Sequence, residues 1–175
     1  FDEFHVKTAA SEMTFAVKIP LPDGSTLEWA GADLDSVFAQ RRNLFNLPFL
    51  RMLKDIVRFN RQTTAMAATE GRLESISVGD FLRQHNYSSE FRHWYLLPMA
   101  GCIWSCPTEQ MLAFPLATFV RFCSNHGLIQ ITNRPQWYTV VGGAKHYVQK
   151  MLPSIAHTFL NTAVKSVTRI GMNSP

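Results

Sequence analysis

Short apolar runs separated by turn residues occupy the first thirty positions of the chain. Residues 6–10, 14–19 and 26–29 each carry apolar side chains over about the length of a strand. Between the second and third runs, residues 20–24 read Pro-Leu-Pro-Asp-Gly, which is the composition of a turn. The pattern therefore predicts β structure for the N-terminal region.

The middle of the chain changes to helical spacing. Asp33 is predicted to cap a short helix that runs through Gln40, and Pro48 suits the first turn of a longer helix. In that longer helix, apolar residues recur every three or four positions, at Leu50, Leu53 and Val57. Capping and stop residues predict three more helices: 78–85 after Ser77, one from Ser88 or Ser89 toward Trp104, and 107–126 before Gly127.

The last third returns to strand-like runs at 128–132 and 136–141. Gly142 and Gly143 then separate the second run from an apolar stretch at helical spacing, and a further strand-like run follows at 163–167. Dinucleotide-binding proteins use this order of strand, glycines, helix and strand. However, the chain contains no Gly-x-Gly-x-x-Gly, so the pattern is only half present.

These elements predict an α+β fold. We expect a small antiparallel or mixed sheet, made of the N-terminal strands and residues 128–141, packed by a helical layer from residues 33–126. The C-terminal helix and strand are expected to be detached from the sheet to which they naturally belong.

Composition adds that part of the surface is expected to be covered by more protein. The 175 residues are 46% hydrophobic but only 17% charged, against about 25% in typical globular chains. The chain opens on Phe1, and residues 1–5 resemble the end of a helix, so we interpret it as a segment of a longer protein. Three unevenly spaced cysteines, with no signal peptide or membrane span, predict a reducing cytoplasm.

The net charge of +4 is mild, and part of it lies on one predicted helix, at Arg51, Lys54, Arg58 and Arg61. A solvated outer face explains this stripe most simply. The alternative function is a helical binding module that uses the basic face for an anionic lipid or a nucleic acid. No basic motif with interleaved aromatic residues supports nucleic-acid binding, so no such partner is expected.

Metal and acid–base chemistry have weak support. Cys102, Cys106, Cys123 and His126 have a spacing that zinc would accept, but they fall within predicted helices rather than on tight turns. Buried free cysteines are the simpler interpretation. The histidines and carboxylates show no nucleophile signature and no pairing, so catalytic residues stay unassigned.

Residues 95–122 are apolar around most of their helices, with breaks at Pro98, Gly101 and Pro107. A helix without a polar face is buried, or else it forms the wall of an apolar cavity. Core packing explains the stretch most simply. Small residues beside a large aromatic one, such as Ala100 beside Trp104, would also suit a site for an apolar substrate.

Several segments together resemble a known family. They read EMTFAV, LEWAG, FAQRRNLF, RMLKDIVRFNR, YLLPMAGCIWSCP, FPLATFVRFCSNHGL and RPQWYTVVGGAKHYVQKM, and they span nearly the whole chain. The chain resembles the middle portion of bacterial FAD/NAD-binding proteins described as flavin-containing amine oxidases. Their architecture is similar to that of monoamine oxidase, protoporphyrinogen oxidase and phytoene desaturase.

The resemblance implies an FAD domain built from separated segments. The first segment, with its glycine fingerprint, would lie before Phe1; the chain would then build a substrate domain and return, with a last flavin-binding segment after Pro175. Residues 1–135 would be the substrate-binding (cap) segment and residues 136–175 the return segment. Neither the expected aromatic cage nor a carboxylate for an amine substrate is evident here.

By the same resemblance, Gly142, Gly143 and Val164 would contact FAD, Val164 through its strand backbone at the adenine end. Met99, Ala100, Ile103 and Trp104 would wall the pocket for a small apolar or amine-like substrate. The implied partners are the remainder of the FAD domain and a second copy that covers exposed apolar surface. The segment alone is expected to hold no FAD and to be inactive.

Overall fold

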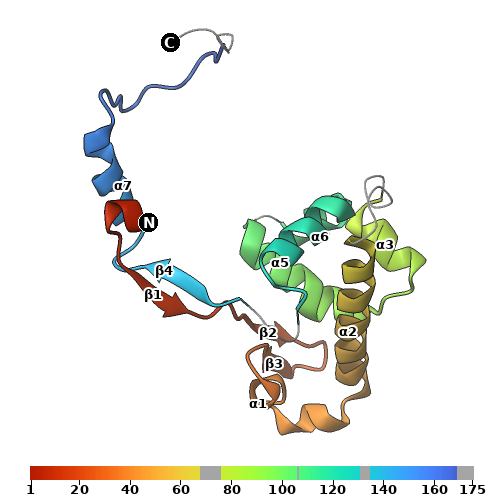
Figure 1. The fold of residues 1–175 in the computed structure, drawn as a ribbon. Helices are drawn as coiled ribbons and strands as arrows, with labels where there is room; N and C mark the ends of the chain where they lie inside the picture. The colour runs from red at the N-terminus through yellow and green to blue at the C-terminus, as the bar shows by residue number, and fades with distance from the viewer. Residues whose placement is uncertain (68–75, 106, 131–134, 169–175) are drawn as a thin grey trace. The chain divides into compact units, whose positions relative to one another are not determined.

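The computed structural model describes residues 1–67, 76–105, 107–130 and 135–168. The chain divides into two compact units, Met13–Gln136 and a second unit of Phe1–Glu12 with Trp137–Pro175. Helices predominate, and the described strands form two antiparallel pairs (Figure 1), so the α+β class is confirmed. Our sequence prediction joined these strands in one sheet, but the structure pairs them separately, one pair in each unit.

The unit of residues 13–136 begins with a hairpin of β2 (Ala16–Pro20) and β3 (Thr26–Ala30). In the turn between them, the Asp23 carboxylate accepts hydrogen bonds from the backbone N–H and the hydroxyl of Ser25, at 2.9 and 2.7 Å. Leu27 and Trp29 alternate with half-buried residues along β3 and are buried. This alternation turns one face of the hairpin toward the core.

Helices make up the rest of this unit, and several of them are short. They are α1 (Leu34–Val37), α2 (Leu47–Ala67), α3 (Val78–Gln84), α4 (Ser89–Phe91), a π-helical turn (Arg92–Leu96), α5 (Leu97–Trp104) and α6 (Leu116–Asn125). Two 3-10 turns, Arg41–Phe45 and Thr108–Ala113, lie between them. Helices α4 and α5 and the π turn follow one another without interruption, as predicted for the helix running toward Trp104.

The predicted caps are present. Asp33 forms a capping box with Ser36, and the Ser77 and Ser88 hydroxyls accept from the N–H groups of Asp80 and Phe91. Helix α1 ends at Val37 rather than at Gln40. The Gln40 side chain bonds the β3 backbone instead, donating to the Thr26 carbonyl and accepting from the Glu28 N–H.

The helix predicted for residues 107–126 is broken at Pro115. A residue before proline disfavours helical dihedrals, and Phe114 is extended, so a 3-10 turn precedes Pro115 and α6 begins after it. Helix α6 ends in a Schellman motif, with Gly127 at φ 64° and the Leu128 N–H bonded to the Cys123 carbonyl at 2.9 Å. Residues 128–130 form no strand, so that prediction is wrong; residues 131 and 132 lie outside the described residues.

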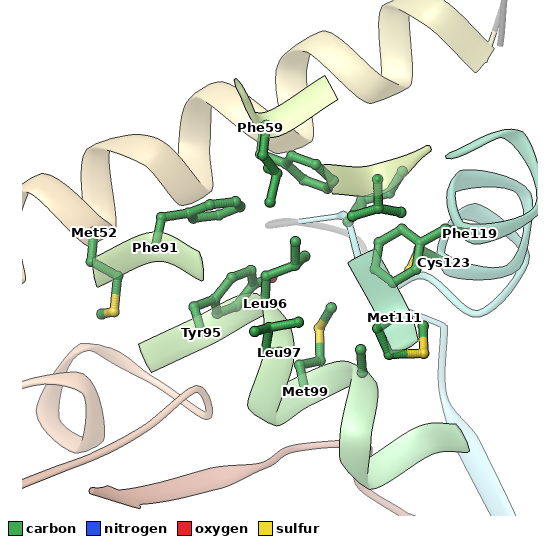
Figure 2. Close-up of a cluster of buried hydrophobic side chains, with 14 of the residues drawn as sticks. Met52, Phe59, Phe91, Tyr95, Leu96, Leu97, Met99, Met111, Phe119 and Cys123 are labelled. Carbon is green, nitrogen blue, oxygen red and sulfur yellow. The ribbon is translucent and has the colours of Figure 1, made fainter. Parts of the chain in front are cut away.

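An aromatic cluster fills the core of this unit. Phe59 of α2 packs with ring centroids at 5.3 Å from Phe91 and 6.0 Å from Phe81. Figure 2 shows Phe59, Phe91 and Tyr95 beside one another, with Phe119 and Cys123 of α6 on another side of the cluster. One buried cluster thus holds α2, α3, α5 and α6 together.

The second unit pairs the two ends of the chain. Strand β1 (Thr8–Ser11) runs antiparallel to β4 (Trp137–Val140), with Thr8 opposite Val140. A glycine turn leads from β4 into α7 (Lys145–Met151), and a 3-10 turn at Leu152–Ser154 ends the helical part. The expected boundary after residue 135 and the boundary after Gln136 differ by one residue, while residues 1–12 group with the C-terminal segment.

The strand predicted at residues 163–167 is absent. Residues 155–168 form neither helix nor strand, and Val164 and Val167 are 79% and 89% exposed. A strand needs a neighbouring strand to bond its backbone groups, and no described strand lies beside this segment. Among the described residues, no helix combines the length and apolar character needed to cross a bilayer.

Candidate functional site

The apolar residues expected to wall a substrate pocket lie in and beside the core. Met99 and Ala100 are 4% and 1% exposed, whereas Ile103 and Trp104 are half-buried and pack at the margin of the core. Cys102, on the opposite side of α5, is exposed. The structure thus brings the four predicted residues together on one helix, with two of them reaching only partly into the interior.

Trp104 has a specific aromatic environment. Its ring stacks on Phe119 at 5.6 Å and meets Phe122 and Phe114 at 4.6 and 5.7 Å. Three phenylalanines therefore take up the space around the indole. This arrangement packs the end of α5 against α6 and the preceding segment, and only part of Trp104 stays accessible.

Gly142 and Gly143 form the turn between β4 and α7. Both have positive φ angles, +79° and +91°, which residues other than glycine rarely adopt. A Cβ on Gly142 would lie 2.4 Å from His146 Nε2, whereas a Cβ on Gly143 would meet open space. The Gly143 N–H bonds the Val140 carbonyl at 3.0 Å, which closes the turn.

The residues expected to touch FAD do not form a cradle for it. Gly142 has His146 at the place where its missing side chain would be, and Val164 lies on an exposed segment outside any strand. A strand backbone at Val164, which adenine recognition would need, is therefore missing. The described residues alone do not fit FAD, and no step of flavin chemistry is assigned to them.

The zinc-like spacing does not assemble into a cluster among the described residues, where no three His, Cys, Asp or Glu side chains gather. Cys106 lies outside the described residues. Cys123 is buried on α6, and this burial raises the pKa of its thiol to about 12. His126 stacks on Phe122 at 3.9 Å, and its Nδ1 lies 2.8 Å from the Phe122 carbonyl.

The basic stripe on α2 is partly neutralised by neighbouring groups. Arg58 pairs with Asp55 at 3.0 Å and lies over the Tyr87 ring at 4.0 Å, while Arg51 lies 3.7 Å from Glu90. Burial raises the pKa of the Tyr87 hydroxyl to about 12, so this ring stays neutral beneath the guanidinium. Arg58 therefore acts mainly within the chain, holding α2 to the segment before α4.

The structure also contains a cavity with several polar lining residues that sequence reasoning missed. It measures about 200 Å³ and lies between α3, the start of α4 and the π turn, with Leu112 of a 3-10 turn on its wall. The clue in the sequence was that five polar residues lie close together along the chain: Arg83, Ser88, Ser89, Arg92 and His93. Taken singly, each is typical of a helix cap or of the surface. None of the four predicted pocket residues lines this cavity.

No protein-family model matches this chain, and neither does any curated protein or any solved structure. The resemblance to flavin-containing amine oxidases therefore rests on the sequence segments alone and stays a prediction.

Proposed function

We propose that the chain is the substrate-domain portion of an FAD-dependent oxidoreductase of the amine-oxidase type. In this proposal the complete enzyme passes a hydride from a C–N or C–C bond of a small apolar or amine-like substrate to flavin. The 175 residues supply the wall for the substrate, while other segments hold the cofactor. We place the enzyme in the cytoplasm, because three unevenly spaced cysteines give no disulfide framework.

The observation that carries the proposal is the order of the two units along the chain, in which one unit lies between the two segments of the other. Residues 13–136 form one compact unit, and the segments on either side of it pair with each other as β1 and β4. A substrate domain inserted into an FAD domain would leave and re-enter in this manner, through neighbouring strands. In this proposal, β1 and β4 are the strands through which the chain leaves the FAD domain and returns to it.

Apolar surface on the second unit supports the same proposal. Val6 is its one core residue among those described, and α7 buries none. The large exposed side chains beyond α7 are Leu152, Ile155, Phe159, Leu160, Val164 and Val167. Exposed apolar patches commonly mark contact surfaces. We propose that the remainder of the FAD domain covers these side chains. When that remainder is absent, a second copy of the chain covers them instead.

The test measures how substrates reduce the flavin of the protein made from the complete open reading frame that contains these residues. Anaerobic mixing with a series of hydrophobic amines and of apolar alkenes or saturated rings is expected to bleach the flavin for one of these classes. An Ile103→Ala variant is expected to lower the reduction rate or raise the substrate concentration needed, because Ile103 lies at the accessible edge of the proposed wall.

Val57→Ala is the matched control, since Val57 is an apolar residue of the same unit that is 53% exposed on α2. It is expected to leave the reduction unchanged. If no member of either substrate class reduces the flavin, or if both variants behave alike, the substrate-domain proposal is wrong.

The alternative function, anionic-lipid or nucleic-acid binding through α2, has less support. It requires a free basic face, whereas Arg51 and Arg58 are directed toward carboxylates of the same chain. No described contact favours it over the oxidoreductase proposal.

A further inference from the structure

The cavity beside the π turn is lined by donors of hydrogen bonds and by no carboxylate. Its polar lining residues are Arg83, Tyr87, Ser88, Ser89, Arg92 and His93, and the remaining three, Gly79, Leu82 and Leu112, are apolar. Two guanidinium groups and an imidazole therefore surround a space of about 200 Å³. Such a lining places two cationic side chains and several neutral donors at one concave surface, while their carboxylate partners, Asp80 and Glu109, are not among the lining residues.

Arg92 has a donor that the described chain leaves unused. Its Nε is buried and finds no hydrogen-bond partner among the described residues. A buried unpaired donor costs free energy unless a ligand, an ion or water satisfies it. Arg92 and His93 also open the π turn, a rare backbone form that occurs often at functional sites.

The neighbouring carboxylates leave capacity for a ligand. Glu109 Oε2 lies 3.4 Å from Arg92 Nη2, which is a long contact, and the Arg92 side chain is 35% exposed. Asp80 pairs with Arg83, but it also accepts the Ser77 hydroxyl at 2.6 Å, and this bond is the main cause that lowers the pKa of the Asp80 carboxyl. Each guanidinium has five N–H donors, so one carboxylate contact does not saturate it.

The hydroxyl groups complete the lining. Ser88 Oγ accepts from the Phe91 N–H at 3.2 Å, and accepting this bond leaves the Ser88 O–H able to donate. Gly79 sits against Leu112, where a Cβ would lie 3.0 Å from the Leu112 carbonyl. The absence of a side chain on Gly79 therefore allows the 3-10 turn to approach α3 closely at this wall of the cavity.

We propose that this cavity is a binding site for a small oxyanion, such as a phosphate group or a carboxylate. Its size falls below the roughly 300–1,000 Å³ of pockets for drug-sized molecules, so an anionic group fits better than a whole nucleotide. Arg92 and Arg83 bind the oxyanion through charge-assisted hydrogen bonds, with the Ser88 and Ser89 hydroxyls as further donors. This site is separate from the proposed substrate wall on α5 and does not depend on flavin.

The test is a titration of the 175-residue chain with inorganic phosphate, followed by NMR at the backbone amides of Ser88, Ser89 and His93. Sodium chloride at the same ionic strength serves as the reference, and acetate in a parallel titration distinguishes a carboxylate preference from a phosphate preference. Saturable shifts with phosphate or acetate, but not with chloride, are the expected result.

Arg92→Gln and Arg83→Gln are expected to weaken this binding by about tenfold each, the low end for a hydrogen bond to a charged group. Arg61→Gln removes the same charge from an exposed position on α2 that does not line the cavity, and it is expected to bind like the parent chain. Near-UV circular dichroism verifies that each variant keeps the aromatic core; if Arg92→Gln does not fold, Arg83→Gln carries the comparison. Shifts that chloride reproduces, or equal affinities in the cavity variants and Arg61→Gln, overturn the proposal.

Discussion

Asp55 is a carboxylate of α2 that is only 5% exposed. Its Oδ2 accepts the Ser88 N–H at 2.9 Å, and its Oδ1 pairs with Arg58 at 3.0 Å. Removing it leaves a partly buried N–H and a partly buried guanidinium without their acceptor. We therefore expect Asp55→Ala to lower the free energy of unfolding by about 2–3 kcal/mol, measured by urea denaturation.

Asp35→Ala is the control for that variant, because the Asp35–Arg41 pair lies on the surface with side chains 80% and 63% exposed. Exposed ion pairs contribute little to stability, so no measurable change is expected. Equal losses of unfolding free energy in the two variants would show that Asp55 does not stabilise the contact between α2 and the start of α4.

Cys123 and Cys102 are expected to differ in reactivity. The raised pKa of Cys123, about 12, keeps the thiol protonated at neutral pH, while Cys102 is exposed. In a Cys106→Ser background, a thiol reagent is expected to label Cys102 in the folded chain and Cys123 only after unfolding. A thiol with a raised folded-state pKa stabilises the fold below its unfolded pKa near 9, and this contribution is lost as pH rises toward 12. Rapid labelling of Cys123 in the native chain would contradict its burial.

At the scale of elements, Phe59 is the residue through which α2 holds its neighbours. It is 1% exposed, and its ring packs with Phe81 of α3, Phe91 of α4 and Phe119 of α6. Phe59→Ala is expected to cost about 3–5 kcal/mol in urea denaturation, and Phe59→Leu clearly less, because leucine fills most of the space.

Phe45→Ala is the matched control, since Phe45 is 88% exposed on a 3-10 turn. Its unfolding free energy is expected to stay within about 0.5 kcal/mol of the parent value. A Phe45→Ala loss as large as that of Phe59→Ala would mean that the cluster around Phe59 does not form the core.

The glycine turn between β4 and α7 makes a second prediction at this scale. Gly143→Ala is expected to cost about 1–2 kcal/mol from its positive φ alone, since the added Cβ meets open space. Gly142→Ala adds a clash with His146, so it is expected to cost more, and Gly142→Ala with His146→Ala should return to the Gly143→Ala level. Hydrogen exchange at the Val141 N–H, which bonds the Lys7 carbonyl, measures the effect. Unchanged exchange in all three variants would contradict the turn.

Local chemistry predicted much of the element order. Ser77 and Asp33 start helices where their side chains can accept backbone N–H bonds, and this signal needs no knowledge of the rest of the fold. The break at Pro115 was a local signal that the prediction overlooked, whereas the strand errors occurred where a distant partner decides. The β-branched run at 163–167 has strand composition but no described strand beside it, and β4 pairs with β1 across more than 120 residues of chain.

The candidate site was predictable only in part for the same reason. The apolar composition of α5 left core packing and a pocket wall as alternatives, and the structure buries Met99 and Ala100 while Ile103 and Trp104 stay half-buried. The oxyanion cavity joins residues of α3, α4, the π turn and a 3-10 turn, whose approach depends on the packing of the whole unit. The closeness of Arg83 and Arg92 along the chain was a clue, but closeness alone does not show that two arginines share a cavity.

At the scale of the whole molecule, the two units differ in how much of their apolar side-chain surface they bury. Residues 13–136 contain nearly all of the buried core, whereas the unit of β1, β4 and α7 leaves its apolar side chains exposed. The proposed function is based partly on this difference in burial. In the proposal made above, the first unit is the substrate domain, and the second is the portion of an FAD domain whose apolar side chains further protein would cover.

The proposed function also implies that flavin is held outside these 175 residues. In this architecture FAD is held mostly at the N-terminus of a helix beside a glycine-rich turn, for which residues 1–175 contain no Gly-x-Gly-x-x-Gly. A single backbone hydrogen bond contributes about 1 kcal/mol, whereas even millimolar affinity requires about 4 kcal/mol. The glycine turn and the exposed segment around Val164 therefore supply too little to hold the cofactor.

The flavin content of two purified proteins tests this account most directly: the 175-residue chain, and the product of the complete open reading frame that contains it. Visible absorbance and cofactor release after denaturation measure the ratio of FAD to protein in each. The account predicts stoichiometric FAD in the complete product and a colourless 175-residue chain. A complete product without flavin, or a yellow 175-residue chain with stoichiometric FAD, would contradict it.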